Sequence, residues 1–393
     1  MDTNNPPRVL KFYLFKTAWM FMLIFAINVV FYRANGISIS KITILDVIWA
    51  VVAFLAEIPT GILADRWSRK YMLVLSGCLA SIGFLIFSVS SSYFPFIVAI
   101  SFLALRSSFE SGTFNALLYD TLKETGHENR YEKVLGRCNF LGVLSVITAG
   151  IIGSYLAKGD IRLPFFLSIF SSTLAAVIAF TFKEPKIHTG SETVKITQHL
   201  KTAAGYIMAH PLIRFIFFYF IMTDIAISCL DEYDQLYLTE IEFPLVMFGV
   251  WIGLRRGLSG IGSFYAEKFK HLSSSSLKLF ILAALILSLA AISFGPKYVG
   301  LTAFMLIFPM WGVVEVLISG ELHSQIDSQR RATVESFVVF FGVTMHIPAV
   351  LLFGYISQVF GIRKGYLYLM ILLVAYLPYF LAKRSILSNL RNQ

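Results

Sequence analysis

Apolar residues form long runs along this chain, and short polar segments separate them. A run of roughly 20 mainly apolar residues is long enough to cross the hydrocarbon layer as a helix. We predict six such spans in the first half, at residues 10–32, 42–64, 71–89, 94–119, 138–157 and 163–182. Six more follow at residues 212–234, 246–266, 277–294, 298–321, 333–358 and 365–382. The pattern therefore predicts an all-α membrane protein with twelve transmembrane helices in two six-helix halves. No small-residue cleavage site follows the first run, which we expect to stay as an anchor.

The longest polar connection lies between the sixth and seventh spans. We predict an N-terminal six-helix bundle at residues 1–183, a cytoplasmic linker at 184–210 and a C-terminal six-helix bundle at 211–393. Within the linker, apolar residues recur at helical spacing at Ile196, Leu200, Ala203, Ala204 and Ile207. This spacing predicts an amphipathic helix along the inner membrane surface, with a disordered linker as the alternative.

Composition and charge agree with a multi-pass membrane protein. Hydrophobic residues make up 57% of the chain and charged residues 14%, whereas soluble proteins carry about 25% charged residues. Of the 33 Lys and Arg residues, 22 lie in connections on the N-terminal side of the membrane and 7 on the other side. Positive charge collects in the cytoplasm, so we expect both termini there and the protein in the cell membrane. The net charge of +10 is spread between spans, which argues against a nucleic-acid surface.

Enzyme chemistry has no support in the sequence. The three cysteines, Cys78, Cys138 and Cys229, form no CxxC pair and indicate neither a zinc site nor a disulfide framework. No Gly-rich phosphate loop or nucleophile elbow is present, and the cytoplasmic segments are too short for an ATPase domain. We expect no enzymatic activity, cofactor or metal.

A charged turn follows the second span. The segment reads Gly61-Ile-Leu-Ala-Asp65-Arg66-Trp-Ser-Arg69-Lys70, and Glu57, Gly61 and Asp65 share one helix face because they are spaced by four. It resembles the Gly-x-Leu-Ala-Asp-Arg-x-Gly-Arg-Lys loop of the major facilitator superfamily, with serine at position 68 in place of the usual glycine. The resemblance covers the whole chain, and it implies the twelve-helix fold of bacterial drug or metabolite exporters.

By this resemblance, the turn acts as a conformational latch made of Gly61, Asp65, Arg66, Arg69, Lys70, Glu57 and Glu335. The Asp65 carboxylate would meet the positive N-terminal end of the eleventh span and stabilise the outward-open state. In the superfamily fold the second and eleventh spans adjoin, which would bring Glu57 near Glu335. The alternative is that the three cations of the turn only set the topology.

Charges inside the spans are candidate site residues, because each costs at least roughly 2.5 kcal/mol unless it is paired or faces a cavity. The acids are Glu57, Glu110, Asp224, Glu315 and Glu335, and the bases are Lys16, Arg106, Arg255 and Arg256. This balance suggests mutual pairing with one carboxylate free to titrate. Arg106 and Glu110 lie four apart and can pair within one helix, either as a structural ion pair or for substrate or proton handling.

The second half offers further candidates for a proton or substrate cavity. We expect Asp224 to pair across helices with Arg255 or Arg256, of which only one can point straight at a cavity. Glu315 and His346 could carry protons, although a lone histidine on an apolar helix is more often a hydrogen-bonded interior residue. Asn28 and Tyr32, in the outer part of the first span, are modest cavity candidates.

Glycines mark close helix packing in two spans. Gly249, Gly253 and Gly257 recur every four residues in the eighth span, and the fifth span carries Gly142, Gly150 and Gly153. By resemblance, these spans line the boundary between the halves, where smooth faces would let the halves rock. Static tight packing would use the same residues.

These observations lead to a secondary transporter that exports a small organic solute or drug by proton antiport and alternating access. We expect a monomer in the lipid bilayer, with a small-molecule substrate and protons as partners. The segment 148–153 departs from drug antiporters because it lacks their Gly-Pro. Proton-coupled uptake of a small organic solute therefore stays open, and the two arginines would suit an anionic one. A non-transporting receptor or scaffold is a third alternative, against which the intramembrane acids argue.

Overall fold

The computed structural model describes residues 7–185, 205–269, 274–324 and 331–384. Within these residues, ten helices are long and apolar enough to cross a membrane. Every predicted span corresponds to a helix or to a pair of consecutive helices, so the twelve-span fold is confirmed. Two predicted spans are not among these ten helices. The first is broken into two helices, and in the eighth Arg255 and Arg256 lower the mean hydropathy.

The chain forms two compact units. Unit 1 comprises Met1–Ile37, Ile44–Glu192 and Phe243–Gly253, and unit 2 comprises Ser38–Thr43, Thr193–Glu242 and Leu254–Gln393. Two helices thus contribute to both units, because residues 39–43 belong to unit 2 and residues 248–253 to unit 1. The predicted amphipathic linker helix lies largely outside the described residues, and only residues 205–209 of it are seen, as helix.

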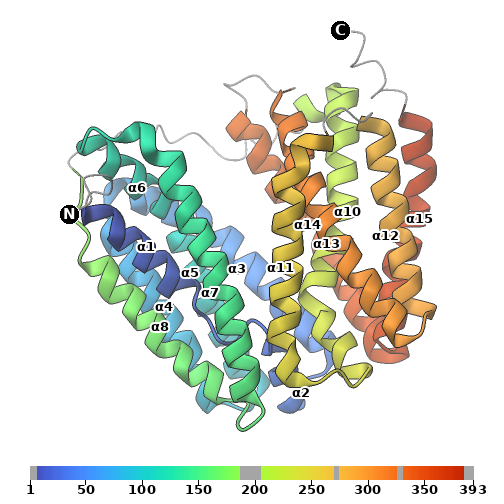
Figure 1. Ribbon diagram of the computed structural model, residues 1–393, viewed down its shortest axis with the longest axis horizontal. Helices are drawn as coiled ribbons and strands as arrows, with labels where there is room; N and C mark the ends of the chain where they lie inside the picture. The colour runs from blue at the N-terminus through green and yellow to red at the C-terminus, as the bar shows by residue number, and fades with distance from the viewer. Residues whose placement is uncertain (1–6, 186–204, 270–273, 325–330, 385–393) are drawn as a thin grey trace. The chain divides into compact units, whose positions relative to one another are not determined.

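Unit 1 holds the helices of the first six spans. They are α1 (Pro7–Met20), α2 (Asn28–Ala34), α3 (Ile39–Arg66), α4 (Arg69–Val89), α5 (Tyr93–Glu110), α6 (Thr113–Glu124), α7 (Tyr131–Ala157) and α8 (Leu163–Phe180). Helix α4 packs along α5 and α8 (Figure 1). Stacked rings join α1 to its neighbours, with Phe12 and Phe182 centroids 4.5 Å apart and Phe15 and Phe114 centroids 5.7 Å apart. Aromatic packing of this kind fixes the position of α1 in the unit.

The first span is interrupted in its middle. Helix α1 ends at Met20 and α2 begins at Asn28, although residues 21–27 include neither glycine nor proline. Tertiary contacts hold the interruption: the Ser168 hydroxyl accepts a hydrogen bond from the Leu23 N–H at 3.0 Å, and Gly153 lies against the Leu23 carbonyl. Because buried backbone groups need partners, the Ser168 hydroxyl replaces a bond that an unbroken helix would make, while Gly153 leaves room for the Leu23 carbonyl.

The fourth span bends at Gly112, between α5 and α6. Its φ is +69°, a value that a residue with a Cβ adopts only under strain. The bend carries the chain from α5 into the amphipathic α6, which buries Phe114, Leu117 and Leu118 in unit 1.

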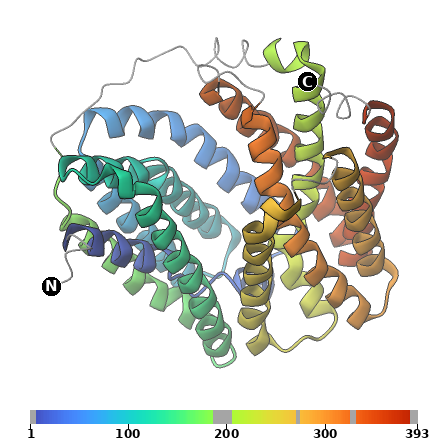
Figure 2. The ribbon, with the colours of Figure 1, turned by 45° about the horizontal axis from the view of Figure 1, so that its top comes forward.

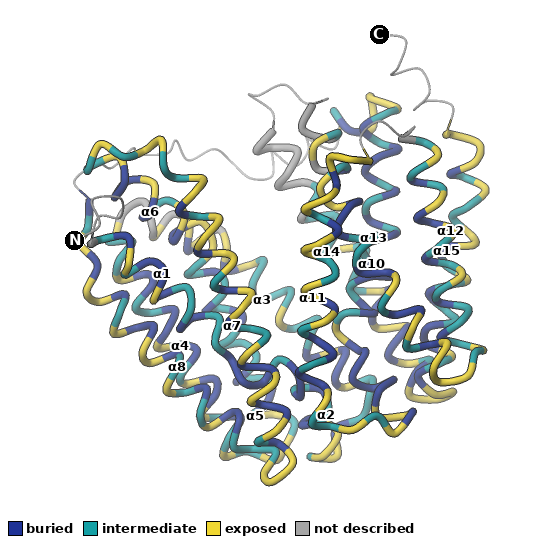
Figure 3. Tube along the Cα trace, in the orientation of Figure 1, coloured by how far each residue is buried: buried dark blue, intermediate teal, exposed yellow. Residues whose placement is uncertain are grey.

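Unit 2 holds the helices of the last six spans. They are α10 (Pro211–Glu240), α11 (Phe248–Tyr265), α12 (Ser274–Phe294), α13 (Lys297–Ser324), α14 (Arg331–Phe360) and α15 (Ile362–Lys383). Helix α10 contacts α13, α14 and α15 and is buried over much of its length (Figure 3). Helix α15, in red, packs against α12 (Figure 2). A long, buried α10 can therefore carry charged groups that its neighbours must satisfy.

Close packing between the fifth and eighth spans is present in unit 1. A Cβ added at Gly150 would lie 3.6 Å from the Gly249 Cα, and one at Gly253 would lie 3.0 Å from the Ile147 side chain. Gly257, the third glycine of the predicted series, has nothing within 4 Å of such a Cβ. Two of the three glycines therefore serve this contact between α7 and α11.

Candidate functional site

Glu110 at the end of α5 pairs with Lys16 of α1. The Lys16 Nζ lies 2.9 Å from the Glu110 carboxylate, and each side chain is 13% exposed. The same Nζ lies 5.1 Å from the Trp19 ring centroid and 5.0 Å from that of Phe114. The predicted pair of Arg106 and Glu110 within one helix is therefore wrong, because a lysine from a neighbouring helix takes the carboxylate.

Arg106 is buried and turned to the interruption of the first span. Its guanidinium donates to the carbonyl oxygen of Trp19 and contacts the Met22 sulfur at 2.7 Å. Its central carbon lies 3.7 Å from the Trp19 ring centroid, a close cation–π contact. The last carbonyls of a helix have no partner within the helix, and here Arg106 supplies one at the end of α1. Arg106 therefore stabilises the break between α1 and α2.

The two adjacent arginines of α11 bind two aspartates of α10, Asp231 and Asp234. Arg255 is 2% exposed and lies 2.7 Å from Asp231 and 3.1 Å from Asp234. Arg256, 52% exposed, lies 2.8 Å from the second oxygen of Asp231. The expected pair of Asp224 with an arginine is therefore wrong. Two carboxylates and two guanidiniums form a neutral cluster, which we call the α10–α11 charge cluster.

The electrostatic neighbour of Asp224 is Glu315 instead. Asp224 in α10 is half-buried and Glu315 in α13 is exposed, and the two carboxylates interact electrostatically. Within the described part of the chain, no Lys, Arg or His lies within 4.0 Å of either carboxylate. Both carboxylates carry negative charge when ionised, so neither can compensate the other. In this respect the two differ from Glu110, whose carboxylate is paired with Lys16.

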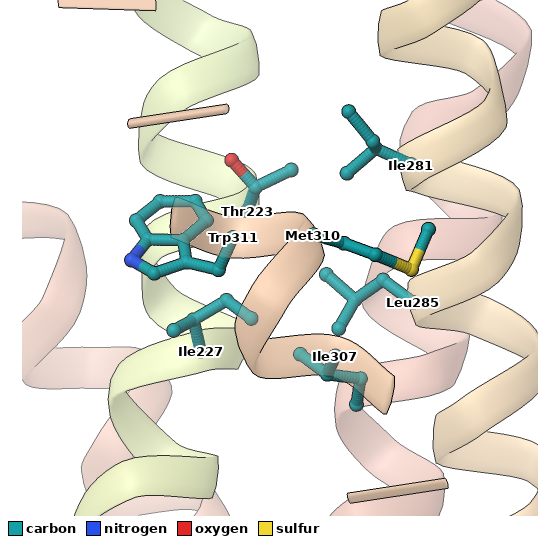
Figure 4. A pocket seen from close by; sticks show the side chains of 7 residues that line it. All are labelled: Thr223, Ile227, Ile281, Leu285, Ile307, Met310 and Trp311. Atoms are coloured by element: carbon teal, nitrogen blue, oxygen red, sulfur yellow. The ribbon is translucent and has the colours of Figure 1, made fainter. Parts of the chain in front are cut away.

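A small cavity lies between α10, α12 and α13, and its lining includes neither carboxylate. Thr223 of α10, Trp311 of α13 and Ile281 of α12 are among its lining residues (Figure 4). Its volume is about 10 Å³, which is room for about one water molecule. The Thr223 hydroxyl is already bonded to the Tyr219 carbonyl at 2.8 Å. The cavity is therefore too small and too apolar to hold an organic solute.

The remaining cavity candidates lie in different surroundings. Tyr32 is buried in an aromatic cluster, with its ring centroid 5.7 Å from those of Phe87 and Phe96. Asn28 is the first residue of α2, and His346 is half-buried in α14, two residues before Pro348. None of them joins the ion pairs, and the described residues contain no group of three His, Cys, Asp or Glu that could hold a metal.

The charged turn after the second span is held by two acids that sequence reasoning missed, Glu184 and Asp120. The Glu184 carboxylate accepts the Ser68 hydroxyl at 2.6 Å and the backbone N–H groups of Arg69 and Lys70 at 3.0 Å each. Arg69 forms an ion pair with Asp120. A carboxylate at the start of α4 satisfies orphan N–H groups and complements the helix dipole. Serine at position 68 thus adds a bond that the glycine usual in this loop could not make.

The latch itself is only partly described. Glu57 and Gly61 are exposed on α3. The Lys70 Nζ lies 4.4 Å from the Phe180 ring centroid. The side chains of Asp65, Arg66 and Glu335 lie outside the described part of the structure. The latch therefore stays a prediction.

Equivalent ion pairs and arginine contacts recur in the two units. Asp120 pairs with Arg69 at the start of α4, and Glu321, 201 residues later, pairs with Lys278 in the first turns of α12. Arg162 donates to the carbonyls of Ser88 and Ser90, at the end of α4. Its counterpart at the same offset, Arg363, donates to the carbonyl of Gly295, at the end of α12, at 2.7 Å. Contacts that recur at an offset of 201 residues are expected of two homologous halves.

Solved structures of transporters share this fold. A mutant of the nucleoside transporter NupG superposes with a TM-score of 0.80 at 14% identity, covering 95% of this chain and 99% of that one. A bacterial homologue of the human lysosomal transporter Spinster gives 0.69 at 14%, covering 98% and 99%. A mutant of the peptide transporter POT gives 0.69 at 12%, covering 97% and 96%. Identities this low show the fold alone.

Sequence comparison gives the family. None of the curated proteins matches this chain. The family model of the Major Facilitator Superfamily matches residues 12–344, which is most of the sequence. Together with the all-helical fold and its transporter neighbours, this match shows that the chain belongs to the Major Facilitator Superfamily.

Proposed function

We propose that this protein is a proton-coupled secondary transporter that exports a small organic solute by antiport. The observation that carries the proposal is the pair of Asp224 and Glu315, two interacting carboxylates on membrane-spanning helices with no cation within 4.0 Å among the described residues. Such a pair can gain and lose one proton with little rearrangement, because a second negative charge is costly there.

Three other acids within the spans support this assignment, because each is paired with a cation. Glu110 is bound to Lys16, and Asp231 and Asp234 are bound to Arg255. An ion pair with a permanent cation favours the ionised carboxylate, so these three acids are poor proton carriers. We therefore assign the proton function to the pair in α10 and α13 rather than to these three acids.

The α10–α11 charge cluster bears on the alternative of anion uptake. That alternative used Arg255 and Arg256 as binding groups for an anionic solute. Each arginine is already neutralised by an aspartate at 2.7–2.8 Å, so neither offers free positive charge. This favours export of a neutral or cationic solute over uptake of an anion.

The test is flux in everted vesicles with an acid interior, using ethidium, uridine and a dipeptide as probes. Antiport predicts that at least one probe dissipates the pH gradient. Asp224→Asn and Glu315→Gln should abolish this dissipation yet keep probe exchange between the two sides. Glu240→Gln is the matched control, since this glutamate pairs with Arg363 at the end of α10.

Three outcomes would contradict the proposal. Dissipation that survives in both carboxylate variants removes them as proton carriers. Loss of dissipation in the Glu240→Gln control would show that the effect is not specific to Asp224 and Glu315. Accumulation driven by an inward proton gradient in right-side-out vesicles, without efflux in everted ones, replaces antiport with uptake.

We propose further that the protein lies in the cell membrane with both termini in the cytoplasm. The support is the distribution of 22 Lys and Arg against 7 on the two sides of the spans. On this orientation the turn between α3 and α4 is cytoplasmic, where the superfamily latch would act.

A further inference from the structure

A groove of about 490 Å³ lies between α11, α12 and α13 in unit 2. Its walls are almost wholly apolar: Ile261 and Tyr265 of α11, Phe280 of α12, and Met310 and Val313 of α13 all line it. All three helices belong to predicted spans, so the groove lies at the depth of the hydrocarbon layer. An apolar groove at that depth suits a hydrocarbon chain.

One cation lines the groove among the described residues. Lys268 lies in the short 3-10 turn that follows α11, and its Nζ is 4.7 Å from the Tyr265 ring centroid. The lysine side chain is exposed, and no acid of the described chain lies within 4.0 Å of it. The nearby Lys278 is buried and bound to Glu321, so it cannot serve a ligand. Among the described residues that line the groove, positive charge therefore lies at one end.

The groove runs from the membrane surface towards the middle of the spans. Lys268 and Leu277 flank the connection between α11 and α12, which the orientation proposed above places in the cytoplasm. Pro309 and Met310 lie at the middle of the 28-residue α13. A ligand with an anionic head at Lys268 and an apolar tail towards Met310 would match both ends.

We propose that this groove binds an anionic phospholipid of the cytoplasmic leaflet, with one acyl chain along α11 and α13 and the headgroup phosphate at Lys268. Lysines near the membrane surface attract anionic lipids, and basic pockets between spans on this side recognise their headgroups. The acyl chain contributes van der Waals packing along the groove, because hydrocarbon already surrounds it in bulk lipid and no apolar surface is removed from water.

The test counts bound lipids by native mass spectrometry after reconstitution of the full chain. The probes are phosphatidylglycerol and phosphatidylcholine with identical chains. Lys268→Gln should lower phosphatidylglycerol retention about fivefold, the effect of one lysine near the surface. Lys297→Gln is the matched control because its Nζ also lies over an adjacent tyrosine ring, at 5.4 Å, at the start of α13. Ile261→Trp, at a half-exposed position lining the groove, should lower retention of both lipids.

Three results would overturn the inference. Equal retention of phosphatidylglycerol and phosphatidylcholine by the unaltered protein removes the anionic headgroup. Equal effects of Lys268→Gln and Lys297→Gln remove the site at Lys268. Unchanged retention in Ile261→Trp removes the groove, provided that its unfolding temperature matches the unaltered protein. Because lipid retention is read without transport, these outcomes are independent of the antiport test.

Discussion

The Arg106 guanidinium caps the end of α1 by donating to the carbonyl oxygen of Trp19, and it stacks on the ring of the same tryptophan. One side chain therefore satisfies the backbone where the first span breaks and covers the aromatic group beside it. A buried carbonyl without a partner costs about 1–3 kcal/mol, which sets the scale of what this contact contributes.

Replacing Arg106 with leucine should destabilise the protein by about 2 kcal/mol, because the Trp19 carbonyl loses its partner. For unfolding units of this size, that lowers the unfolding temperature by roughly 4–8 °C. Arg106→Gln should recover about half of the loss, since its amide can still donate. The measurement is thermal unfolding in detergent. Equal unfolding temperatures for Arg106→Leu and the unaltered protein would show that the cap is not structural.

The carboxylate of Glu184 caps α4, and its removal gives a second prediction. Glu184→Gln should lower stability by about 1 kcal/mol, because a negative charge next to two backbone N–H groups is lost. Hydrogen exchange at Arg69 and Lys70 should accelerate in step with the fall in unfolding temperature. The adjacent, exposed Lys183→Gln is the control and should change neither. Faster exchange in the control alone would refute the cap.

The spans were predictable because long apolar runs leave few alternatives to membrane helices. The ion-pair partners of the charged side chains could not be predicted in the same way. Arg106 and Glu110 have ideal spacing for a pair within one helix, yet Lys16 of another helix takes Glu110. Sequence spacing gives only the pairs that can form within one helix, whereas the partner of a buried charge can come from any helix packed around it.

The break in the first span shows the same limit for the backbone. Residues 21–27 are apolar and contain neither glycine nor proline, so nothing local predicts an interruption. Its causes, Arg106, Gly153 and Ser168, stand on three other helices. In contrast, Asp231 and Asp234 carried a usable signal, because two acids three residues apart share one helix face. Both lie within the span predicted at 212–234, close to its expected end, whereas the helix continues to Glu240.

Arg255 and Arg256 are adjacent in sequence but differ in burial, so their substitutions should differ in cost. Arg255→Gln leaves Asp234, 1% exposed, without its cation and should cost about 3–5 kcal/mol. Arg256→Gln removes a half-exposed partner of Asp231 and should cost less than about 1 kcal/mol. Denaturant or thermal unfolding measures both.

A second substitution distinguishes an uncompensated charge from lost packing. Adding Asp234→Asn to Arg255→Gln should restore part of the stability, because the buried negative charge is removed as well. If the double variant is less stable than Arg255→Gln alone, the cost lies in packing around Arg255 and not in the charge.

Gly153 provides the sharpest test of the broken span. A methyl group at this position would overlap the carbonyl oxygen of Leu23 in the interruption, and the backbone there is held on both sides by Arg106 and Ser168. Gly153→Ala should therefore destabilise by about 1–3 kcal/mol, as overpacking does. Gly136→Ala, on the same helix α7 with nothing within 4 Å, should stabilise by about 0.5–1 kcal/mol through helix propensity. Opposite shifts in unfolding temperature for these two identical substitutions would tie the effect to the Leu23 contact. Shifts of the same sign would show that α7 moves at Gly153 and that the interruption does not depend on the close approach of Gly153 to Leu23.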